Sequence, residues 1–562
     1  MEIEENIKEA LIKVAGVKSK EIVIEIPKQN LGDYAFPCFQ LSSEQKKNPA
    51  IIAKEIVEKL SKKLPKEIGK IEASGGYVNF FLNKEIFAKQ VLEEIDEKKE
   101  KYGMSEEGKG KSVVIDFSSP NIAKPFNIGH LRSTILGFSL YRIFNFLDYK
   151  SIGVNHVGDW GTQFGQLIYA YNKWGSETSL KKEPIKHLLE LYVRFNQELE
   201  NKPELQEQAR EEFKKLENND KKAVELWKNF RELSLKDFNK IYELLGVKFD
   251  YITGESFYND KMARTVELLK AKKLTEMSQG ALVVNLEKYK MPPCILKKSD
   301  EASTYATRDL TAALYRQDTF KPAKILYVVG SEQRLHFKQV FKVLELAGFD
   351  FAKNCVHVPF GLIRLHEGKL STRAGRVVFM EDVLEKGFVL AKKIIEKKNP
   401  KLSNKEKVAR AVAIGAIIYS DISNDRVLDI KFDWNKALSF EGNSGPYLQY
   451  AYVRASSILK KIGKEQGGKI NFNKIDDKEF ILLKEISRLN NTIKQASLNF
   501  KPNIIANYVY NLSQTFNDFY ENCPVINAEQ GVKARRIALV RATKQVVENC
   551  LGLLCIPIVD TM

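Results

Sequence analysis

The chain has 562 residues, and a prior of roughly 100–200 residues per domain predicts three to five domains. Hydrophobic residues make up 44% of the chain and charged residues 29%, which excludes wholesale disorder and collagen-like repeats. The net charge of +17 lies after residue 108, a balance typical of proteins that bind polyanions but also of chains with many solvated lysines.

Residues 1–108 are predicted to form a small α+β domain. Apolar residues recur at helical spacing over the first 14 residues, and EIVIEI (21–26) predicts a strand. The sequence GGYVNFFL (75–82) alternates after a glycine pair and predicts a second strand. The charged, glycine-containing stretch EEIDEKKEKYGMSEEGKGK then indicates a linker.

Residues 109–400 begin with a βαβ pattern. The apolar strand SVVIDF (112–117) leads through a proline-containing turn into the helical pattern LRSTILGFSLYRIFNFL, and the strand YKSIGVN (149–155) follows. This order predicts an α/β fold with a Rossmann-type, doubly wound parallel sheet. A highly charged stretch with helical spacing follows, and we predict a helical insertion over about 170–295.

Strand patterns return at ALVVNL, KILYVVG and CVHVPFGLI, and the glycine-bounded loop HEGKLSTRAGRV follows the last of them. Residues 401–436 are predicted to be connecting helices. Residues 437–562 show amphipathic helical spacing throughout and predict an α-helical bundle.

Several classes of site and location are not expected from the sequence. The longest apolar stretch, Val412–Tyr419, is far shorter than the ~18 residues of a membrane span. The N-terminus is acidic and has no apolar leader segment, so we expect a cytoplasmic protein without a membrane partner. Six cysteines without a CxxC pair and six histidines without an HExxH pattern predict no zinc site and no other protein-bound metal.

The turn after the strand 112–117 carries the strongest chemical signal. In SSPNIAKPFNIGHLRST, Gly129 precedes His130 where a helix is predicted to begin. A glycine lets a phosphate approach the backbone, and a helix N-terminus offers N–H donors at the positive end of the dipole. His130 and Asn127 can donate to phosphate oxygens, and Lys124 adds a charge. A lone GxH is equally a helix cap, but its place in a doubly wound sheet favours a nucleotide site.

This segment resembles the HIGH signature of class I aminoacyl-tRNA synthetases, and in detail that of the arginyl-tRNA synthetases. SSPNIAK, GHLRSTILG and the downstream NHVGDWGTQFG are similar to the catalytic-domain pattern of that family. Asn127 stands in place of the first histidine of HIGH, and an amide can donate a hydrogen bond but carries no charge. The resemblance implies that Lys124, Asn127, Gly129 and His130 bind ATP, and that all but the glycine are catalytic.

The segment GKLSTRAG occupies the place of the family's KMSKS loop, which closes over the ATP triphosphate. Lys369 and Ser371 match its first and third positions, whereas its second lysine is replaced by Thr372. The resemblance implies that Lys369, Leu370 and Ser371 bind ATP, that Lys369 and Ser371 are catalytic, and that Lys124 compensates for the missing lysine. By itself the segment is equally a basic surface loop.

An arginine substrate makes its own demand on a binding pocket. Its guanidinium is planar and permanently charged, so a selective pocket needs carboxylates in bidentate reach. Tyr305 and Asp309 are four residues apart and can share a helix face, and Glu255 follows a strand-like string. Spacing alone favours a different interpretation, namely an exposed acid, a core tyrosine and a helix-start aspartate. The resemblance implies arginine contacts from Ser119, Pro120, Asn121, His130, Glu255, Tyr305, Asp309 and Gln333.

The string SFEGNSGPYLQYAYVRASS opens the C-terminal helices with three tyrosines and an arginine. Aromatic and guanidinium planes capture unstacked RNA bases, although a tyrosine stripe at helical spacing is more often part of a core. The resemblance implies that residues 437–562 bind the anticodon and that residues 1–108 touch the tRNA elbow. The tRNA contacts it implies are Asn79, Phe81, Tyr447, Tyr450, Arg454, Tyr520 and Met562.

The expected activity is therefore that of an arginine–tRNA ligase, a monomer whose partners are L-arginine, ATP with Mg²⁺, and tRNA(Arg). Two alternatives stay open from the sequence. A class I synthetase for another amino acid would share the phosphate-binding segments and would differ in amino-acid-dependent pyrophosphate exchange. A non-catalytic tRNA-binding paralogue is favoured by Asn127 and Thr372, whereas Lys124, His130 and Asp309 argue against it.

Overall fold

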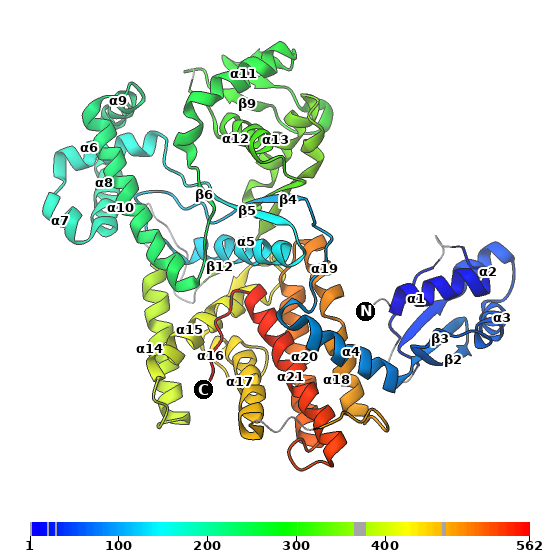
Figure 1. The fold of residues 1–562 in the computed structure, drawn as a ribbon. Coiled ribbons are helices and arrows are strands. Elements are labelled where there is room, and N and C mark those ends of the chain that lie inside the picture. Colours follow the sequence, from blue (N-terminus) through cyan, green and yellow to red (C-terminus); the bar gives the residue numbers. More distant parts are fainter. Residues whose placement is uncertain (1–2, 19–21, 28–30, 301, 365–377, 464–467) are drawn as a thin grey trace. The chain divides into compact units, whose positions relative to one another are not determined.

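The computed structural model describes residues 3–18, 22–27, 31–300, 302–364, 378–463 and 468–562 (Figure 1). These residues divide into two compact units. Unit 1 comprises residues 1–102, 454–489 and 511–547, and unit 2 comprises residues 103–453, 490–510 and 548–562. Both units receive residues from α17 (Gly445–Ile462), α19 (Leu489–Asn499), α20 (Asn503–Asn522) and α21 (Gln530–Leu553).

Unit 1 contains a three-stranded antiparallel sheet in the order β1-β3-β2. Its strands are β1 (Tyr34–Pro37), β2 (Ile68–Ser74) and β3 (Tyr77–Leu82). The strand predicted over 75–82 is confirmed as the central strand β3. The strand predicted at EIVIEI is wrong in extent, because the described part of that segment pairs only through a single bridge between Glu25 and Ala35. Ala35 belongs to β1, a strand that was not predicted from the sequence.

Helices of unit 1 begin at side chains that satisfy free backbone N–H groups. The side chain of Asn48 accepts from the first turn of α3, Asn83 does the same for α4, and Asp476 forms a capping box with Glu479 in α18. The bounds are α1 (Ile3–Ala10), a π-helix (Leu11–Ala15), α2 (Phe39–Gln45), α3 (Pro49–Ser61), α4 (Lys84–Lys98), α17 (Gly445–Ile462), α18 (Asp477–Ser487), α20 (Asn503–Asn522) and α21 (Gln530–Leu553).

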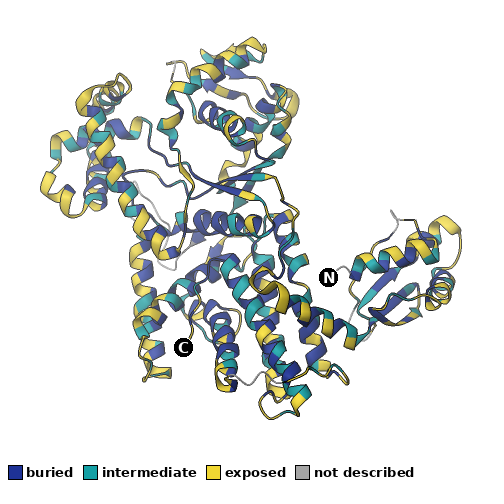
Figure 2. Ribbon diagram, viewed as in Figure 1, coloured by how far each residue is buried: buried dark blue, intermediate teal, exposed yellow. Residues whose placement is uncertain are grey.

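Unit 2 is built on a five-stranded parallel sheet in the order β11-β10-β4-β5-β6. This confirms the predicted doubly wound α/β fold. The strands are β4 (Ser112–Asp116), β5 (Lys150–Asn155), β6 (Tyr251–Ile252), β10 (Lys324–Gly330) and β11 (Cys355–Phe360). The inner strands are buried almost throughout (Figure 2), as expected for a parallel sheet with both faces covered.

Helix α5 (Ile128–Phe146) is the central helix of unit 2 and is buried along most of its length. It packs against β4, β5 and β10 on one side and against α14 and α15 on the other. Arg132, which is 1% exposed, pairs with Asp421 of α15 at 2.8 Å and donates to the carbonyl of Leu428. A buried ion pair therefore holds the helix in place, and losing either partner would leave an unpaired charge inside the protein.

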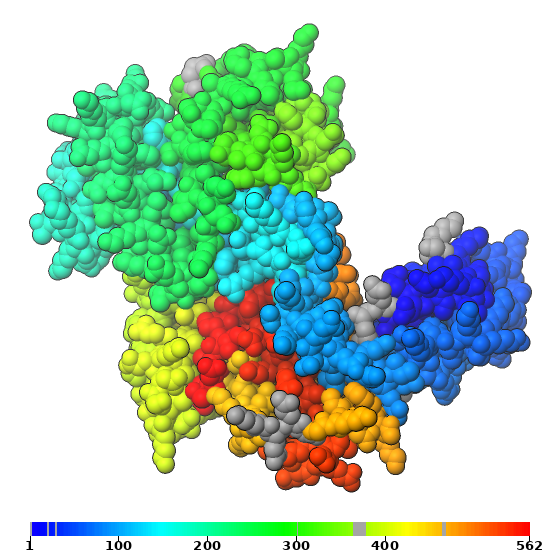
Figure 3. All heavy atoms as spheres, viewed as in Figure 1, coloured from blue at the N-terminus to red at the C-terminus, as the bar shows by residue number. Residues whose placement is uncertain are grey.

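The insertion differs from its prediction in its last part. The insertion is helical as far as Leu245, and its helices form a separate lobe of unit 2 (Figure 3). A three-stranded antiparallel sheet follows at 275–297. ALVVNL therefore belongs to this small sheet and not to the parallel one, because a tight turn at Gln279–Gly280 returns the chain onto the preceding strand. The strands are β7 (Thr275–Ser278), β8 (Ala281–Val284) and β9 (Cys294–Lys297).

The remaining elements of unit 2 surround these sheets. They are α6 (Thr162–Trp174), α7 (Glu177–Lys182), α8 (Pro184–Asn201), α9 (Leu205–Glu217), α10 (Lys221–Leu245), α11 (Met262–Ala271), α12 (Tyr305–Phe320), α13 (Arg334–Leu346), α14 (Met380–Lys398), α15 (Lys405–Ile422), α16 (Trp434–Ala437), α19 (Leu489–Asn499) and the parallel pair β12 (Ile363–Arg364) and β13 (Ile430–Lys431).

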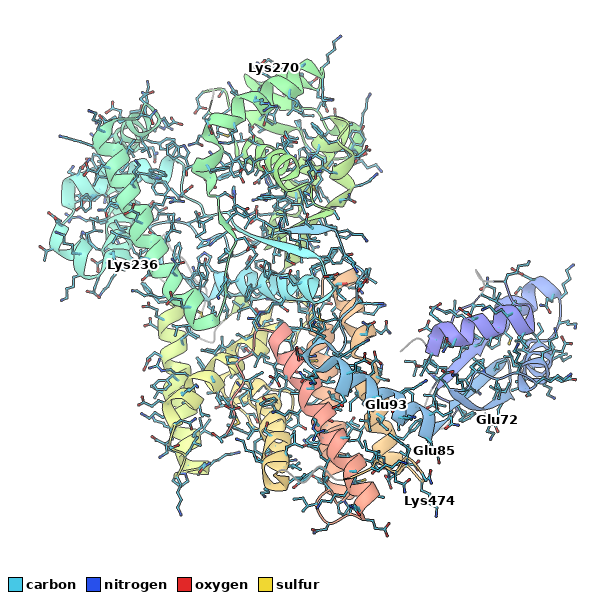
Figure 4. All side chains as sticks on the ribbon, in the orientation of Figure 1. Glu72, Glu85, Glu93, Lys236, Lys270 and Lys474 are labelled. Carbon is cyan, nitrogen blue, oxygen red and sulfur yellow. The ribbon has the colours of Figure 1, made fainter. Side chains whose placement is uncertain are left out.

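Much of the surface charge is solvated. Lysines and glutamates such as Lys236, Lys270 and Glu93 are exposed and point outward (Figure 4). All six cysteines are buried and unpaired. Within the described ranges, no group of three or more histidine, cysteine, aspartate or glutamate side chains is placed to hold a metal ion. None of the described helices is long and apolar enough to cross a membrane.

Candidate active site

The candidate site begins where the chain leaves β4 at the carboxyl edge of the parallel sheet. Ser118, Ser119 and Ala123 adopt positive φ angles of 73°, 50° and 61°, a conformation that costs non-glycine residues of order 1–3 kcal/mol each. The loop is held from both sides. The backbone N–H of Ser119 donates to Asn155 Oδ1 at 3.1 Å, and its hydroxyl donates to Asp116 Oδ1 at 3.1 Å.

A close approach to Gly158 places Asn121. Asn121 and Gly158 form a parallel bridge, Gly158 N donates to the carbonyl of Pro120, and Ile122 N donates to the carbonyl of Gly158. A Cβ atom on residue 158 would lie 2.1 Å from Asn121 Oδ1, so any larger residue would displace the amide. The loop after β5 therefore sets the position of an exposed side chain predicted to bind arginine.

Gly158→Ala is expected to raise the arginine KM by about 2- to 10-fold, the value of one displaced hydrogen bond. The ATP KM should stay close to wild type. Asn121→Ala should have the same effect, and steady-state kinetics of the double variant should show no further loss if both changes act through the same amide. Additive losses would contradict this coupling between Gly158 and Asn121.

The start of α5 carries the second group of predicted residues. Asn127 is the N-cap, and its Oδ1 accepts from the N–H of Gly129 at 2.9 Å. His130 completes a capping box, because its Nδ1 accepts from the backbone N–H of Asn127 at 3.1 Å. The proton of the neutral imidazole must then be on Nε2. The helix therefore presents one neutral N–H donor beside the positive end of its dipole.

The electrostatic surroundings keep His130 neutral. Burial, and then the positive charge of Lys124, lower the pKa of His130 from 6.5 to about 4. Lys124 Nζ lies 5.0 Å from the ring centroid of Tyr192 on α8, within the range of a cation–π interaction. The loop residues Lys369, Leu370 and Ser371, and Thr372 with them, lie outside the described residues.

The third group lies on α12 and α13. Asp309 Oδ2 is 2.5 Å from His336 Nε2, and these side chains are 22% and 23% exposed. Tyr305 begins α12 and is 67% exposed, so it is not the core tyrosine of the alternative interpretation. Gln333 is exposed and directly precedes α13. Helix α12 thus carries an accessible ring and a carboxylate, and the start of α13 adds Gln333 and His336 to the same region.

Glu255 joins this region from the loop after β6. Its side chain is 12% exposed and lies 3.5 Å from Arg308 Nη1, whose guanidinium is 6.0 Å from the Tyr305 ring centroid. Burial raises the pKa of Glu255 to about 7, Arg308 opposes that rise, and the negative charges of Asp309 and Asp159 add to it. Nearby negative charges disfavour the ionised form of Glu255, so a bound cation, whose charge is opposite, would favour it.

The loop after β4 and the carboxylates of the third group are linked by electrostatic contacts beneath the site. The charges of Asp116, which lies beneath the loop after β4, and of Asp309 both act on His156, as do those of Arg316 and Asp159. Arg316 pairs with Asp116 at 2.8 Å, and both side chains are at most 8% exposed. The loop that places Ser119 and Asn121 therefore lies beside the carboxylates on α12 and after β6.

Several residues that build this region were missed from the sequence. Asn155, which is fully buried, accepts from Ser119 N and donates to Tyr242. Asp159, also fully buried, accepts from Arg231 and from both the N–H and the hydroxyl of Ser256. Both lie in the string NHVGDWG, whose polar residues directly after a buried strand were the available signal.

The predicted tRNA-contacting tyrosines differ in exposure. In unit 2, Tyr450 is 38% exposed, whereas Tyr452 is 5% exposed and its hydroxyl lies 3.5 Å from Glu548. Tyr447 is half-buried, and its ring centroid lies 5.6 Å from that of Tyr510. The stripe therefore contains an accessible ring and a core ring two residues apart.

In unit 1, Arg454 donates to Asn517 Oδ1 at 2.7 Å and lies 5.7 Å from the ring centroid of Tyr520, which is 40% exposed. Asn79 is 5% exposed in the central strand β3, and Phe81 is half-buried. In unit 2, the backbone carbonyl of Met562 accepts from Asn399 at 3.2 Å. Of the two predicted elbow contacts, Phe81 is the more accessible.

Tyr450→Ala is expected to raise the tRNA KM by an amount equivalent to about 1–3 kcal/mol, the value of one stacked base, with little change in melting temperature. Tyr452→Ala is the matched control, because truncating that buried ring should cost about 3–5 kcal/mol of stability. Thermal unfolding and tRNA affinity are measured on the same samples. A large stability loss in Tyr450→Ala with unchanged tRNA affinity would show that this ring has a structural role and does not contact tRNA.

Comparisons with known protein families cover nearly the whole chain. Residues 91–434 match the catalytic domain of class I tRNA synthetases (R), residues 448–562 the DALR anticodon binding domain, and residues 1–82 the arginyl tRNA synthetase N terminal domain.

Individual relatives agree with the family matches. The arginine–tRNA ligases of Clostridium perfringens and of a Clostridium botulinum strain are each 50% identical over 96% of both chains. The solved arginyl-tRNA synthetase of Thermus thermophilus is 26% identical with a TM-score of 0.86, and it covers 100% of this chain and 99% of its own. Family matches over most of the chain, and relatives at half identity, show that the chain belongs to the arginyl-tRNA synthetase family of class I aminoacyl-tRNA synthetases.

Proposed function

We propose that this protein is an arginine–tRNA ligase, which activates L-arginine with ATP to arginyl-adenylate and transfers arginine to the 3′-terminal adenosine of tRNA(Arg). One observation carries the proposal. Asp309 and Glu255 stand on neighbouring elements beside an accessible tyrosine, next to the loop at the carboxyl edge of the parallel sheet. A guanidinium is the side chain that two carboxylates and an aromatic face recognise best.

The proposed arginine site combines the carboxylates with the loop after β4. Asp309 and Glu255 bind the guanidinium, and the Tyr305 ring and Gln333 border it. Ser119, Pro120 and Asn121 then bind the α-amino and carboxylate groups together with His130. An uncharged amino acid is rejected because it would leave the carboxylates desolvated without their partner.

The first step needs charge stabilisation at phosphorus rather than a covalent enzyme intermediate. An oxygen of the arginine carboxylate attacks the α-phosphorus of ATP, and the bond to the β-phosphate oxygen breaks to release pyrophosphate. ATP enters as its Mg²⁺ complex. Lys124, Asn127, Gly129 and His130 bind the phosphates at the start of α5, and Lys369, Leu370 and Ser371 are proposed to close over them.

In the second step the 2′-hydroxyl of the terminal adenosine attacks the adenylate carbonyl. The hydroxyl proton leaves with the departing AMP, and the new ester joins arginine to the tRNA. We propose that residues 437–562 hold the anticodon through Tyr447, Tyr450, Arg454, Tyr520 and Met562, and that residues 1–108 touch the tRNA elbow at Asn79 and Phe81. We further propose that the enzyme acts as a cytoplasmic monomer.

An aminoacylation assay with radiolabelled amino acids, ATP, Mg²⁺ and tRNA tests the proposal. Arginine should be attached to tRNA(Arg) and other amino acids should not. Charging with a different amino acid would identify another class I specificity, and tRNA binding without any charging would identify a non-catalytic paralogue. Size-exclusion chromatography with light scattering at assay concentration tests the monomer, for which the chain mass of 64.2 kDa is expected.

A further inference from the structure

The carboxylates around the proposed arginine site are already paired within the protein. Four of them lie in one electrostatic neighbourhood, because their charges act on one another or on His156. Each is within 3.5 Å of a basic side chain. The pairs are Asp116 with Arg316 at 2.8 Å, Asp159 with Arg231 at 2.9 Å, Glu255 with Arg308 at 3.5 Å and Asp309 with His336 at 2.5 Å.

The partner of Asp309 differs from the other three in one respect. Arginine keeps its charge at every pH that a protein tolerates, so its positive charge always offsets that of the carboxylate it faces. An imidazole can lose its proton, and the pair of Asp309 with neutral His336 then keeps one net negative charge. A substrate guanidinium gains more electrostatic energy beside such a charge than beside a carboxylate whose charge an arginine already offsets.

The hydrogen bond fixes what His336 does for Asp309 in either protonation state of the imidazole. Burial alone would raise the pKa of Asp309, but the hydrogen bond and charge of His336, and then the charges of His156 and Arg316, bring that pKa below its usual value. An ionised carboxylate only accepts hydrogen bonds, so His336 Nε2 must carry the hydrogen and donate to Oδ2. The imidazole therefore holds the carboxylate in one orientation, with Oδ1 left to face a ligand.

We propose that His336 is a positioning residue for arginine recognition: neutral His336 orients Asp309 toward the substrate guanidinium, and its protonation opposes arginine binding. This inference rests on the proposed function and adds a residue and a proton to it. Asp309 and His336 lie near the starts of α12 and α13, and both side chains are partly exposed, so the contact is not part of the hydrophobic core.

Proton competition gives this role a measurable sign. If arginine binds only to the form with neutral His336, its Kd rises as pH falls, by up to about tenfold per pH unit for one proton. Glu255, whose pKa is raised to about 7, adds its own proton-linked loss in the same range. Two arginines near the pair keep their charge over this range: Arg316, which acts on Asp309, and Arg334, which lies beside His336 on α13. Burial lowers the pKa of both His156 and His357, which disfavours their cationic forms.

The test compares arginine affinity across pH in three forms of the full-length enzyme with tRNA(Arg) present. Isothermal titration from pH 6 to 8.5 is run on wild type, His336→Gln and His336→Asn. Neither amide titrates, and Gln places a donor near the Nε2 position. The ratio of the wild-type Kd to the His336→Gln Kd should rise as pH falls. At pH 8.5 the Kd of His336→Gln for arginine should be within about threefold of the wild-type Kd. His336→Asn should also lose the part of the pH dependence of the arginine Kd that comes from His336, and it should bind arginine more weakly than wild type at every pH.

His357→Gln is the matched control. His357 is a nearby histidine that packs on Phe337 and bonds to the carbonyl of Val329, and its substitution should leave the wild-type pH slope unchanged. An unchanged slope in both His336 variants would overturn the role of His336 while leaving arginine binding itself intact. Wild-type protein that binds no arginine would refute the proposed function, and this inference with it.

Discussion

His130→Ala is expected to lower kcat by about 10²- to 10³-fold, the usual effect of removing one preorganised donor. The arginine KM should rise far less, because Ser119, Pro120 and Asn121 still bind the amino acid. Nδ1 accepts from the backbone of Asn127, so Nε2–H is the group that remains for an oxygen of the α-phosphate. Charge develops on that oxygen mainly in the transition state. Pre-steady-state measurement of adenylate formation isolates the step, and an unchanged rate would remove His130 from catalysis.

The capping role of His130 needs its own control. His130→Ala also removes the acceptor for the Asn127 N–H, which should cost about 0.5–2 kcal/mol of stability. His130→Gln restores a capping acceptor at this helix position, so its melting temperature should return toward wild type. Its kcat should remain low, because the amide that caps the helix no longer offers a donor in the position of Nε2. Full recovery of kcat would assign the residue to helix capping alone.

The pH dependence of His130 follows from its lowered pKa of about 4. Between pH 6 and 9 the imidazole stays neutral, so its donor contribution to kcat should be constant over that range. For stability, the folded-state pKa lies below the value of 6.5 for a free imidazole. The stability it contributes is therefore complete above pH 6.5 and is lost as pH falls toward 4. Urea unfolding of wild type and His130→Gln across this range measures the difference.

Asp309→Asn is expected to raise the arginine KM by roughly 10- to 150-fold, corresponding to about 1.5–3 kcal/mol for a charge-assisted hydrogen bond. The amide keeps the shape of the side chain and can still accept from His336, but it lacks the charge that faces the guanidinium. The KM for ATP and the affinity for tRNA should stay near wild type. Arginine-dependent pyrophosphate exchange with tRNA present is the measurement.

Asp318→Asn provides the matched control for this substitution. Asp318 lies on the same helix α12 and is exposed, so the same chemical change there should leave the arginine KM at its wild-type value. A wild-type arginine KM in Asp309→Asn would withdraw Asp309 from the pocket. Equal losses in both variants would instead point to a general effect of charge on this helix.

Local features of the fold were predictable because they depend on neighbours in the chain. The strands β4 and β5 and the helix α5 follow from apolar runs and a polar turn of a few residues. The glycine and histidine at the start of α5 indicated a helix N-terminus, and the structure places its cap at Asn127. The family resemblance rested on such short strings in a fixed order, so it could be stated from the sequence.

Pairing between distant segments was decided by tertiary structure alone. The sequence supplied Asp309 and Glu255 as candidates. Nothing local showed that His336, 27 residues after Asp309, or Arg308, 53 residues after Glu255, would lie against them. Exposure was equally undetermined: Tyr450 and Tyr452 share one string, yet only the first is accessible. Burial and charge partners depend on which elements pack together, and that packing is set by long-range contacts that no short pattern of residues encodes.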